Sequence, residues 1–129
     1  MIGLDTNVIV RYLTQDDPAQ SKKANELIDN TLTPAQPGFI TLISLIELAW
    51  VLESCYEQSR ENVHEALNAL LTPRQLMIEN AEMVHLALKR FSGGGDFSDA
   101  LIAVISEFNG CDLVKTFDKK AVRVGMTLL

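Results

Sequence analysis

Short apolar runs alternate along this chain with longer segments in which apolar residues recur every three or four positions. The short runs are typical of buried strands, and the longer segments predict amphipathic helices. Strands are expected at residues 1–4, 38–43, 75–78, 112–116 and 126–129. Helices are expected at residues 8–13, 18–30, 44–56, 60–71, 81–91 and 97–108. Because short apolar strands separated by helices favour parallel pairing, the pattern predicts an α/β sandwich.

Two of the expected helices carry further information. Asp17-Pro18 combines an N-cap residue with a proline at the first helical position, which predicts where the helix over residues 18–30 begins. Residues 44–56 are apolar on nearly every side, so we expect a deeply buried helix with Trp50 in the core.

The composition is that of one folded domain. The chain has 129 residues, of which 47% are apolar, and we find no repeat or linker, so we expect a single domain over residues 1–129. No apolar run approaches the roughly 20 residues that span a bilayer. Cys55 and Cys111 stand alone in apolar sequence, and we see no secretory segment. These features favour buried thiols in a reducing cytoplasm.

The formal net charge of −6 argues against simple electrostatic attraction to nucleic acid. That inference changes if the acids converge on a cation, because clustered carboxylates repel one another unless a metal or basic groups compensate them. Four acids follow expected strands or begin expected helices: Asp5, Glu47, Asp99 and Asp118. In an open parallel sheet such positions gather at the carboxyl edge, where ligands bind. Four carboxylates meeting there would suit Mg²⁺ or Mn²⁺.

Each acid also has a purely local interpretation. Asp5 could cap the turn that follows it, and Asp118 could be a turn residue. Ser44-Leu45-Ile46-Glu47 fits a capping box, in which Glu47 would bond its own helix terminus.

Asp96 and Asp99 follow three glycines, and the local interpretation makes Asp96 a helix cap and Asp99 a companion of the helix dipole. The combination of acids favours a metal site. Glu47 and Asp99 lie on helices expected to be buried, where a charge needs a partner, and few basic residues are near in sequence.

Four motifs, in this order, resemble the PIN domain. They are Leu4-Asp5-Thr6-Asn7, the helical Glu47, Asp99-Ala100-Leu101-Ile102-Ala103 and Thr116-Phe117-Asp118. The resemblance extends over essentially the whole chain with similar spacing. Within the family the chain is most similar to the VapC-like toxins of bacterial and archaeal toxin–antitoxin pairs.

The resemblance implies a Rossmann-like three-layer sandwich, with a parallel central sheet of four to five strands flanked by helices, and a metal-dependent ribonuclease site. The catalytic and metal-binding acids that match by position are Asp5, Glu47, Asp99 and Asp118, with Asp96 as an accessory ligand or a helix cap. Asn7 and Thr116 match supporting polar positions, Asn7 for Asp5 and Thr116 for Asp118 or a water. One or two Mg²⁺ or Mn²⁺ ions would activate a water to attack the scissile phosphorus.

RNA must still approach an acidic protein. Arg11, Lys119 and Lys120 lie close in sequence to the proposed ligands and could meet phosphates. His64 and His85 lie within expected helices away from the acidic motifs, and the chemistry needs no histidine. The resemblance further implies a cognate antitoxin partner and a homodimer, and we expect no membrane association.

Three alternatives stay open. A phosphatase of the haloacid dehalogenase type would want a second Asp two residues after Asp5, where this chain has Asn7. A response-regulator receiver domain would want adjacent acids after the first strand and an acid at the end of the third, where Ile78-Glu79-Asn80 is the nearest match. A PIN-like binding module without catalysis would have no reason to keep four like charges together.

Overall fold

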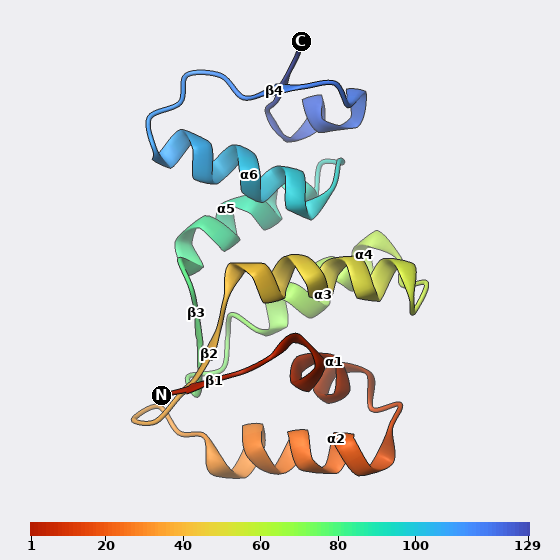
Figure 1. Ribbon diagram of the computed structural model, residues 1–129, viewed down its shortest axis with the longest axis vertical. Coiled ribbons are helices and arrows are strands. Elements are labelled where there is room, and N and C mark those ends of the chain that lie inside the picture. The colour runs from red at the N-terminus through yellow and green to blue at the C-terminus, as the bar shows by residue number, and fades with distance from the viewer. The chain divides into compact units, whose positions relative to one another are not determined.

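The computed structural model describes residues 1–129, which form two compact units, Met1–Glu79 and Asn80–Leu129. We call these the N-terminal unit and the C-terminal unit and describe each by itself (Figure 1). Their elements follow one another as short strands separated by helices, so the α/β fold predicted from the sequence is confirmed.

The N-terminal unit contains a three-stranded parallel sheet. Its strands are β1 (Ile2–Gly3), β2 (Gly38–Ile40) and β3 (Leu76–Ile78), in the spatial order β1-β2-β3. Ile2 is paired with Gly38, and Gly38 is paired in turn with Leu76. Because all three strands run the same way, the residues that follow them lie at one edge of the sheet.

Helices complete the N-terminal unit. They are α1 (Thr6–Thr14), α2 (Pro18–Asn25), the π-helical turn η1 (Glu26–Thr31), α3 (Leu42–Ser54) and α4 (Arg60–Ala69). Helix α1 packs against both α2 and α3, and α3 packs against α4 (Figure 1). The core between them contains Ile9, Ile40, Leu48, Val63 and Leu67, all fully buried. Burying each such side chain contributes about 1.5–3 kcal/mol.

Side chains set where the helices of this unit begin. Asp17 caps α2 as predicted, because its Oδ1 accepts a hydrogen bond from the Gln20 amide at 3.0 Å. Thr41 caps α3 by accepting from the Ser44 amide at 3.1 Å, and Glu79 Oε1 accepts from the Leu42 amide at 2.8 Å. These two acceptors satisfy amides that a helix start leaves open, so α3 begins at Leu42.

The C-terminal unit consists of α5 (Ala81–Phe91), α6 (Phe97–Phe108), β4 (Lys115–Thr116), the 3₁₀ helix η2 (Lys119–Val124) and β5 (Thr127–Leu128). Helices α5 and α6 pack together, and the rings of Phe91 and Phe97 meet edge to face with centroids 6.2 Å apart. Strands β4 and β5 are parallel. Val84, Leu101 and Val124 are buried in the core of this unit.

Two glycines in the loop between α5 and α6 allow η2 to approach closely. Gly94 and Gly95 have φ values of +122° and +78°, which side chains with a Cβ rarely adopt. A Cβ on Gly95 would lie 2.8 Å from Val124 Cγ1 and 3.2 Å from the Lys120 carbonyl oxygen. The glycines therefore bring the segment around η2 against the start of α6.

The predicted helices at residues 81–91 and 97–108 have the observed bounds, while every strand is shorter than predicted. Residues 42 and 43 were expected in a strand and belong to α3, because the caps described above start the helix there. The five strands form sheets of three and two. The single-domain assignment stays a prediction.

Three expectations about burial are wrong. Trp50 is 63% exposed, because it lies on a face of α3 that also carries the exposed Ile43 and Glu47. Cys55 and Cys111 are free thiols, and both are exposed because they follow the ends of α3 and α6.

None of the helices has the length and apolar character needed to span a bilayer.

Candidate metal centre

Three carboxylates gather in the C-terminal unit. Asp96 occupies the N-cap position of α6, Asp99 lies in its first turn, and Asp118 precedes η2. One carboxylate oxygen from each residue lies within 4.8 Å of the other two. We call these three residues the aspartate cluster.

Local structure holds Asp118 in the cluster. Its Oδ1 accepts a hydrogen bond from the Lys120 amide at 2.9 Å, and its own amide donates to Thr116 Oγ1 at 3.0 Å. The turn interpretation of Asp118 is therefore correct, and it coexists with membership of the cluster. The Thr116 hydroxyl thus contacts Asp118 at its backbone amide, and a role of Thr116 in holding the Asp118 carboxylate or a water stays a prediction.

No basic side chain compensates the aspartate cluster. None of the three carboxylates forms a salt bridge, and Asp96 makes no capping bond although it stands at the N-cap position. Partial burial, together with the charges of Asp96 and Asp118, raises the pKa of Asp99 above its usual value. The local interpretation of Asp96 is correct as to position, since it is the N-cap residue of α6, but its carboxylate bonds no amide of the helix.

These properties fit a divalent cation. Carboxylate oxygens are the ligands that Mg²⁺ and Mn²⁺ prefer, and one cation could bind three oxygens at these separations after small side-chain rotations. A bound cation would also remove the like-charge repulsion that raises the pKa of Asp99.

A second acidic group lies in the N-terminal unit. Asp5 follows β1 directly, and Glu47 lies in the second turn of α3. Thr6 Oγ1 donates a hydrogen bond to Glu47 Oε1 at 3.0 Å, which links the start of α1 to α3. Asp5 stands at the N-cap position of α1, yet its carboxylate makes no capping bond.

The structure corrects several assignments around this group. The capping box is wrong, because α3 begins before Ser44 and the Glu47 carboxylate accepts from Thr6. Glu47 is also exposed, since it points away from the core face of α3. Asn7 makes no side-chain hydrogen bond to Asp5.

The supporting residue that sequence reasoning missed is Thr6. Thr6 is 7% exposed. Its place between Asp5 and Asn7, in the motif Leu4-Asp5-Thr6-Asn7, is the feature of the sequence that could have indicated a supporting role. The acid nearest to the receiver-domain pattern, Glu79, caps α3. In this chain Glu79 therefore has a structural role at the start of α3.

The predicted acids therefore fall into two groups. Asp96, Asp99 and Asp118 are brought together in the C-terminal unit, while Asp5 and Glu47 belong to the N-terminal unit. That Asp5, Glu47, Asp99 and Asp118 share one metal site stays a prediction.

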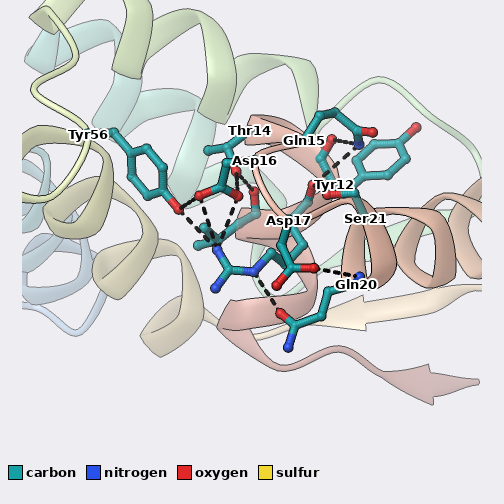
Figure 2. A network of polar contacts seen from close by, with 10 residues as sticks. Tyr12, Thr14, Gln15, Asp16, Asp17, Gln20, Ser21 and Tyr56 are labelled. Atoms are coloured by element: carbon teal, nitrogen blue, oxygen red, sulfur yellow. Dashed lines mark hydrogen bonds and ion pairs between the residues drawn. The ribbon is translucent and has the colours of Figure 1, made fainter.

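The predicted RNA-binding residues differ in their surroundings. Lys119 and Lys120 are exposed on η2 beside the aspartate cluster, and no side-chain partner holds either ammonium. Arg11 is instead held by hydrogen bonds to Asp16, Gln20 and Tyr56 (Figure 2). The group of residues placed to share one cation contains neither His64 nor His85.

Known proteins are similar to this chain over most of its length. The chain is 24% identical over 123 residues to a protein named VapC ribonuclease from Aquifex aeolicus strain VF5. The aligned region covers 95% of this chain and 90% of that protein. No solved structure matches the chain significantly. The family model for the PIN domain matches residues 2–126, which include both acidic groups. The chain thus belongs to the PIN domain family.

Proposed function

We propose that this protein is a Mg²⁺- or Mn²⁺-dependent endoribonuclease that hydrolyses RNA phosphodiester bonds. The observation that carries the proposal is the aspartate cluster, which has no basic partner and includes the acids of two of the motifs on which the family resemblance rests. The relative from Aquifex aeolicus, by its name a VapC ribonuclease, supports RNA as the substrate.

In this proposal Asp96, Asp99 and Asp118 hold the cation, and Asp5 and Glu47 complete the site, as the family resemblance implies. A divalent cation there supplies Lewis-acid polarisation of the phosphoryl oxygen and a more acidic water. Thr116 and Thr6 keep Asp118 and Glu47 in fixed orientations through the hydrogen bonds described above. Lys119 and Lys120 would meet the phosphates of the RNA.

The proposal extends to a biological role as the toxin of a toxin–antitoxin pair. The name of the relative and the family resemblance support this role, which implies a cognate antitoxin, a homodimer and a cytoplasmic location. Growth arrest on induced expression, relieved by co-expression of the adjacent reading frame, would test it.

The enzymatic proposal is tested by incubating purified protein with RNA in Mg²⁺, Mn²⁺ or EDTA. We expect cleavage only with the metals, and a loss of more than about 100-fold in Asp99→Asn, because a direct ligand should matter at least as much as its outer supports. Asp112→Asn is the matched control, since Asp112 is an exposed acid of the same unit outside the cluster. Equal activity of the two variants would refute the assignment of Asp99.

The main competing function is a PIN-like binding module without catalysis. It predicts no RNA cleavage under any metal condition and no calorimetric heat of Mn²⁺ binding. Metal binding without RNA cleavage would support the cation site and refute the proposed ribonuclease activity.

A further inference from the structure

A groove runs between two helical segments of the N-terminal unit. It has a volume of about 320 Å³, and the helices that border it are α1 on one side and α2 with η1 on the other. Its walls include Asn7, Val8 and Arg11 of α1 and Gln20, Lys23 and Leu27 of the facing segment. Val8 and Arg11 on α1 are three residues apart, and Gln20, Lys23 and Leu27 on the facing segment are three and four apart, so each segment has one continuous face toward the groove.

The charges of the groove are all positive, although the chain as a whole has a net charge of −6. Its only charged lining residues are Arg11 and Lys23. Asp16 compensates Arg11 at 3.2 Å, whereas Lys23 is exposed and its ammonium has no hydrogen bond or ion pair. Lys23 is therefore the uncompensated cation of the groove.

Arg11 is held in a fixed position. Its Nε donates to Gln20 Oε1 at 2.7 Å, and its Nη1 donates to the Tyr56 hydroxyl at 3.0 Å and to Asp16 (Figure 2). Its Nη2 has no partner within the protein, so two N–H donors stay available to a ligand. A guanidinium that is already ordered loses little side-chain entropy when it binds a phosphate.

The groove begins close to one of the acidic groups. Asn7 and Val8 lie in the first turn of α1, which starts directly after Asp5. A helical turn rises about 5.4 Å, so a ligand in the groove would reach to within about one turn of Asp5. Volume, charge and position together suit one nucleotide of a chain that continues toward the carboxylates.

We propose that this groove binds one nucleotide of single-stranded RNA next to the scissile phosphate; the inference rests on the ribonuclease function proposed above. Lys23 and Arg11 contact phosphate oxygens, Val8 and Leu27 pack against the base, and the Asn7 carboxamide bonds its edge. A protein segment is the other occupant to consider. The unpaired Lys23 favours the polyanion.

Two neighbouring lysines provide the test. Lys22 and Lys23 are consecutive and exposed on α2, but Lys22 lines a different hollow, together with Pro18 and Asn25. Lys22→Ala and Lys23→Ala therefore change the net charge equally and differ only in which side of the helix loses its ammonium. Their circular dichroism should be the same, because neither side chain is buried.

The first measurement is the fluorescence anisotropy of a labelled, short single-stranded RNA in EDTA, at several salt concentrations. We expect Lys23→Ala to weaken binding several-fold and to lower the slope of log K against log salt by about 0.7, the value for one phosphate contact on a single strand. Lys22→Ala should match the wild type. In Mg²⁺, Lys23→Ala should raise KM for RNA cleavage and leave kcat unchanged.

Equal effects of the two substitutions on both measurements would overturn the groove proposal, while cleavage by the wild type would leave the proposed function intact. A wild type that neither binds nor cleaves RNA would instead remove both. Unchanged RNA binding in Lys23→Ala, with lost binding of a protein partner, would assign the groove to a protein and likewise contradict the proposal.

Discussion

Asp16 in the N-terminal unit and Asp99 in the C-terminal unit are both aspartates near the start of a helix, and their pKa values are shifted in opposite directions. The Tyr56 hydroxyl donates to Asp16 at 2.6 Å and the Thr14 hydroxyl at 2.8 Å, and Arg11 lies 3.2 Å away (Figure 2). These hydrogen bonds, reinforced by the guanidinium charge, lower the pKa of Asp16. The protein itself supplies the partners of this carboxylate.

Asp99 has no such partners. Partial burial and two neighbouring carboxylates, Asp96 and Asp118, raise its pKa. The comparison separates an acid whose charge the protein itself stabilises from an acid, Asp99, whose charge is unfavourable unless something outside the chain compensates it. This difference makes Asp99 the candidate ligand in the proposed cation site, whereas Asp16 is held by the protein at the junction between α1, α2 and the end of α3.

The largest effect that separates the two aspartates is stabilisation by metal. A cation that binds only the folded protein should stabilise it by about 2.7 kcal/mol at a roughly hundredfold excess over Kd. For a chain of this size that is roughly 10 °C in Tm. We expect Mn²⁺ to raise the Tm of the wild type and of Asp16→Asn, and to leave the Tm of Asp99→Asn unchanged in differential scanning fluorimetry.

An increase in Tm on addition of Mn²⁺ that persists in Asp99→Asn would contradict the proposal that Asp99 binds the cation. The same titration sharpens the role of the first acidic group. If Asp5→Asn and Glu47→Gln also lose the shift, their carboxylates share the cation with Asp99. If they keep it, the aspartate cluster binds the cation by itself, and the one-site prediction is wrong.

The next effect concerns the glycine loop that positions the aspartate cluster. Gly95→Ala should destabilise the protein by about 1–3 kcal/mol, because alanine is strained at φ +78° and its Cβ would collide with Val124. Gly93→Ala is the matched control, since Gly93 lacks a positive φ and a Cβ there would meet only Arg90 O, at 3.4 Å. Chemical denaturation measures both free energies of unfolding.

The metal affinity of Gly95→Ala extends this prediction. If η2 shifts, Asp118 moves with it, so Mn²⁺ binding by calorimetry should weaken more in Gly95→Ala than in Gly93→Ala. Equal losses of stability in both variants would show that the loop has no special role in holding η2.

The sequence was sufficient to predict the α/β pattern, the bounds of α5 and α6, and the acidic character of the site. These features depend on apolar periodicity and on residue type, which are local properties. The start of α3 was predicted only approximately: its N-cap, Thr41, is local and lay inside the expected strand, while its second cap comes from Glu79, 37 residues away in sequence. Likewise, the Thr6–Glu47 bond joins residues separated by 41 positions.

The roles of individual acids were predictable only in part. Asp96 has the residue type and position of a helix cap, and only the fold reveals that its carboxylate faces Asp99 and Asp118 instead. The sequence did not predict a structural role for Asp16, since its partner Tyr56 lies 40 residues away. Long-range pairing decides which acids are compensated, and single-sequence patterns do not contain it.

A smaller effect should appear in the metal-free protein. Asp99→Asn removes one of three crowded charges, so in EDTA near neutral pH its Tm should exceed that of the wild type. Asp16→Asn replaces a carboxylate that accepts from Tyr56, Thr14 and Arg11 with a neutral amide, so its Tm should fall. Shifts of the same sign in both variants, measured by circular dichroism, would contradict the contrast between them.

The pH dependence of these shifts is the finest test. The lowered pKa of Asp16 means that its stabilisation is present above its ordinary value of 3.8 and is lost as pH falls through the folded-state value. The raised pKa of Asp99 has the reverse consequence. The contribution of protonated Asp99 to the stability of the folded protein is fully present below 3.8 and is lost as pH rises through the folded-state value. Melting curves in EDTA from neutral pH to about pH 3 should therefore show both variants converging on the wild type. The Asp99→Asn advantage should disappear at a higher pH than the Asp16→Asn deficit, because Asp99 takes up its proton first on acidification. Convergence in the opposite order would mean that the neighbours of the two carboxylates do not control their protonation.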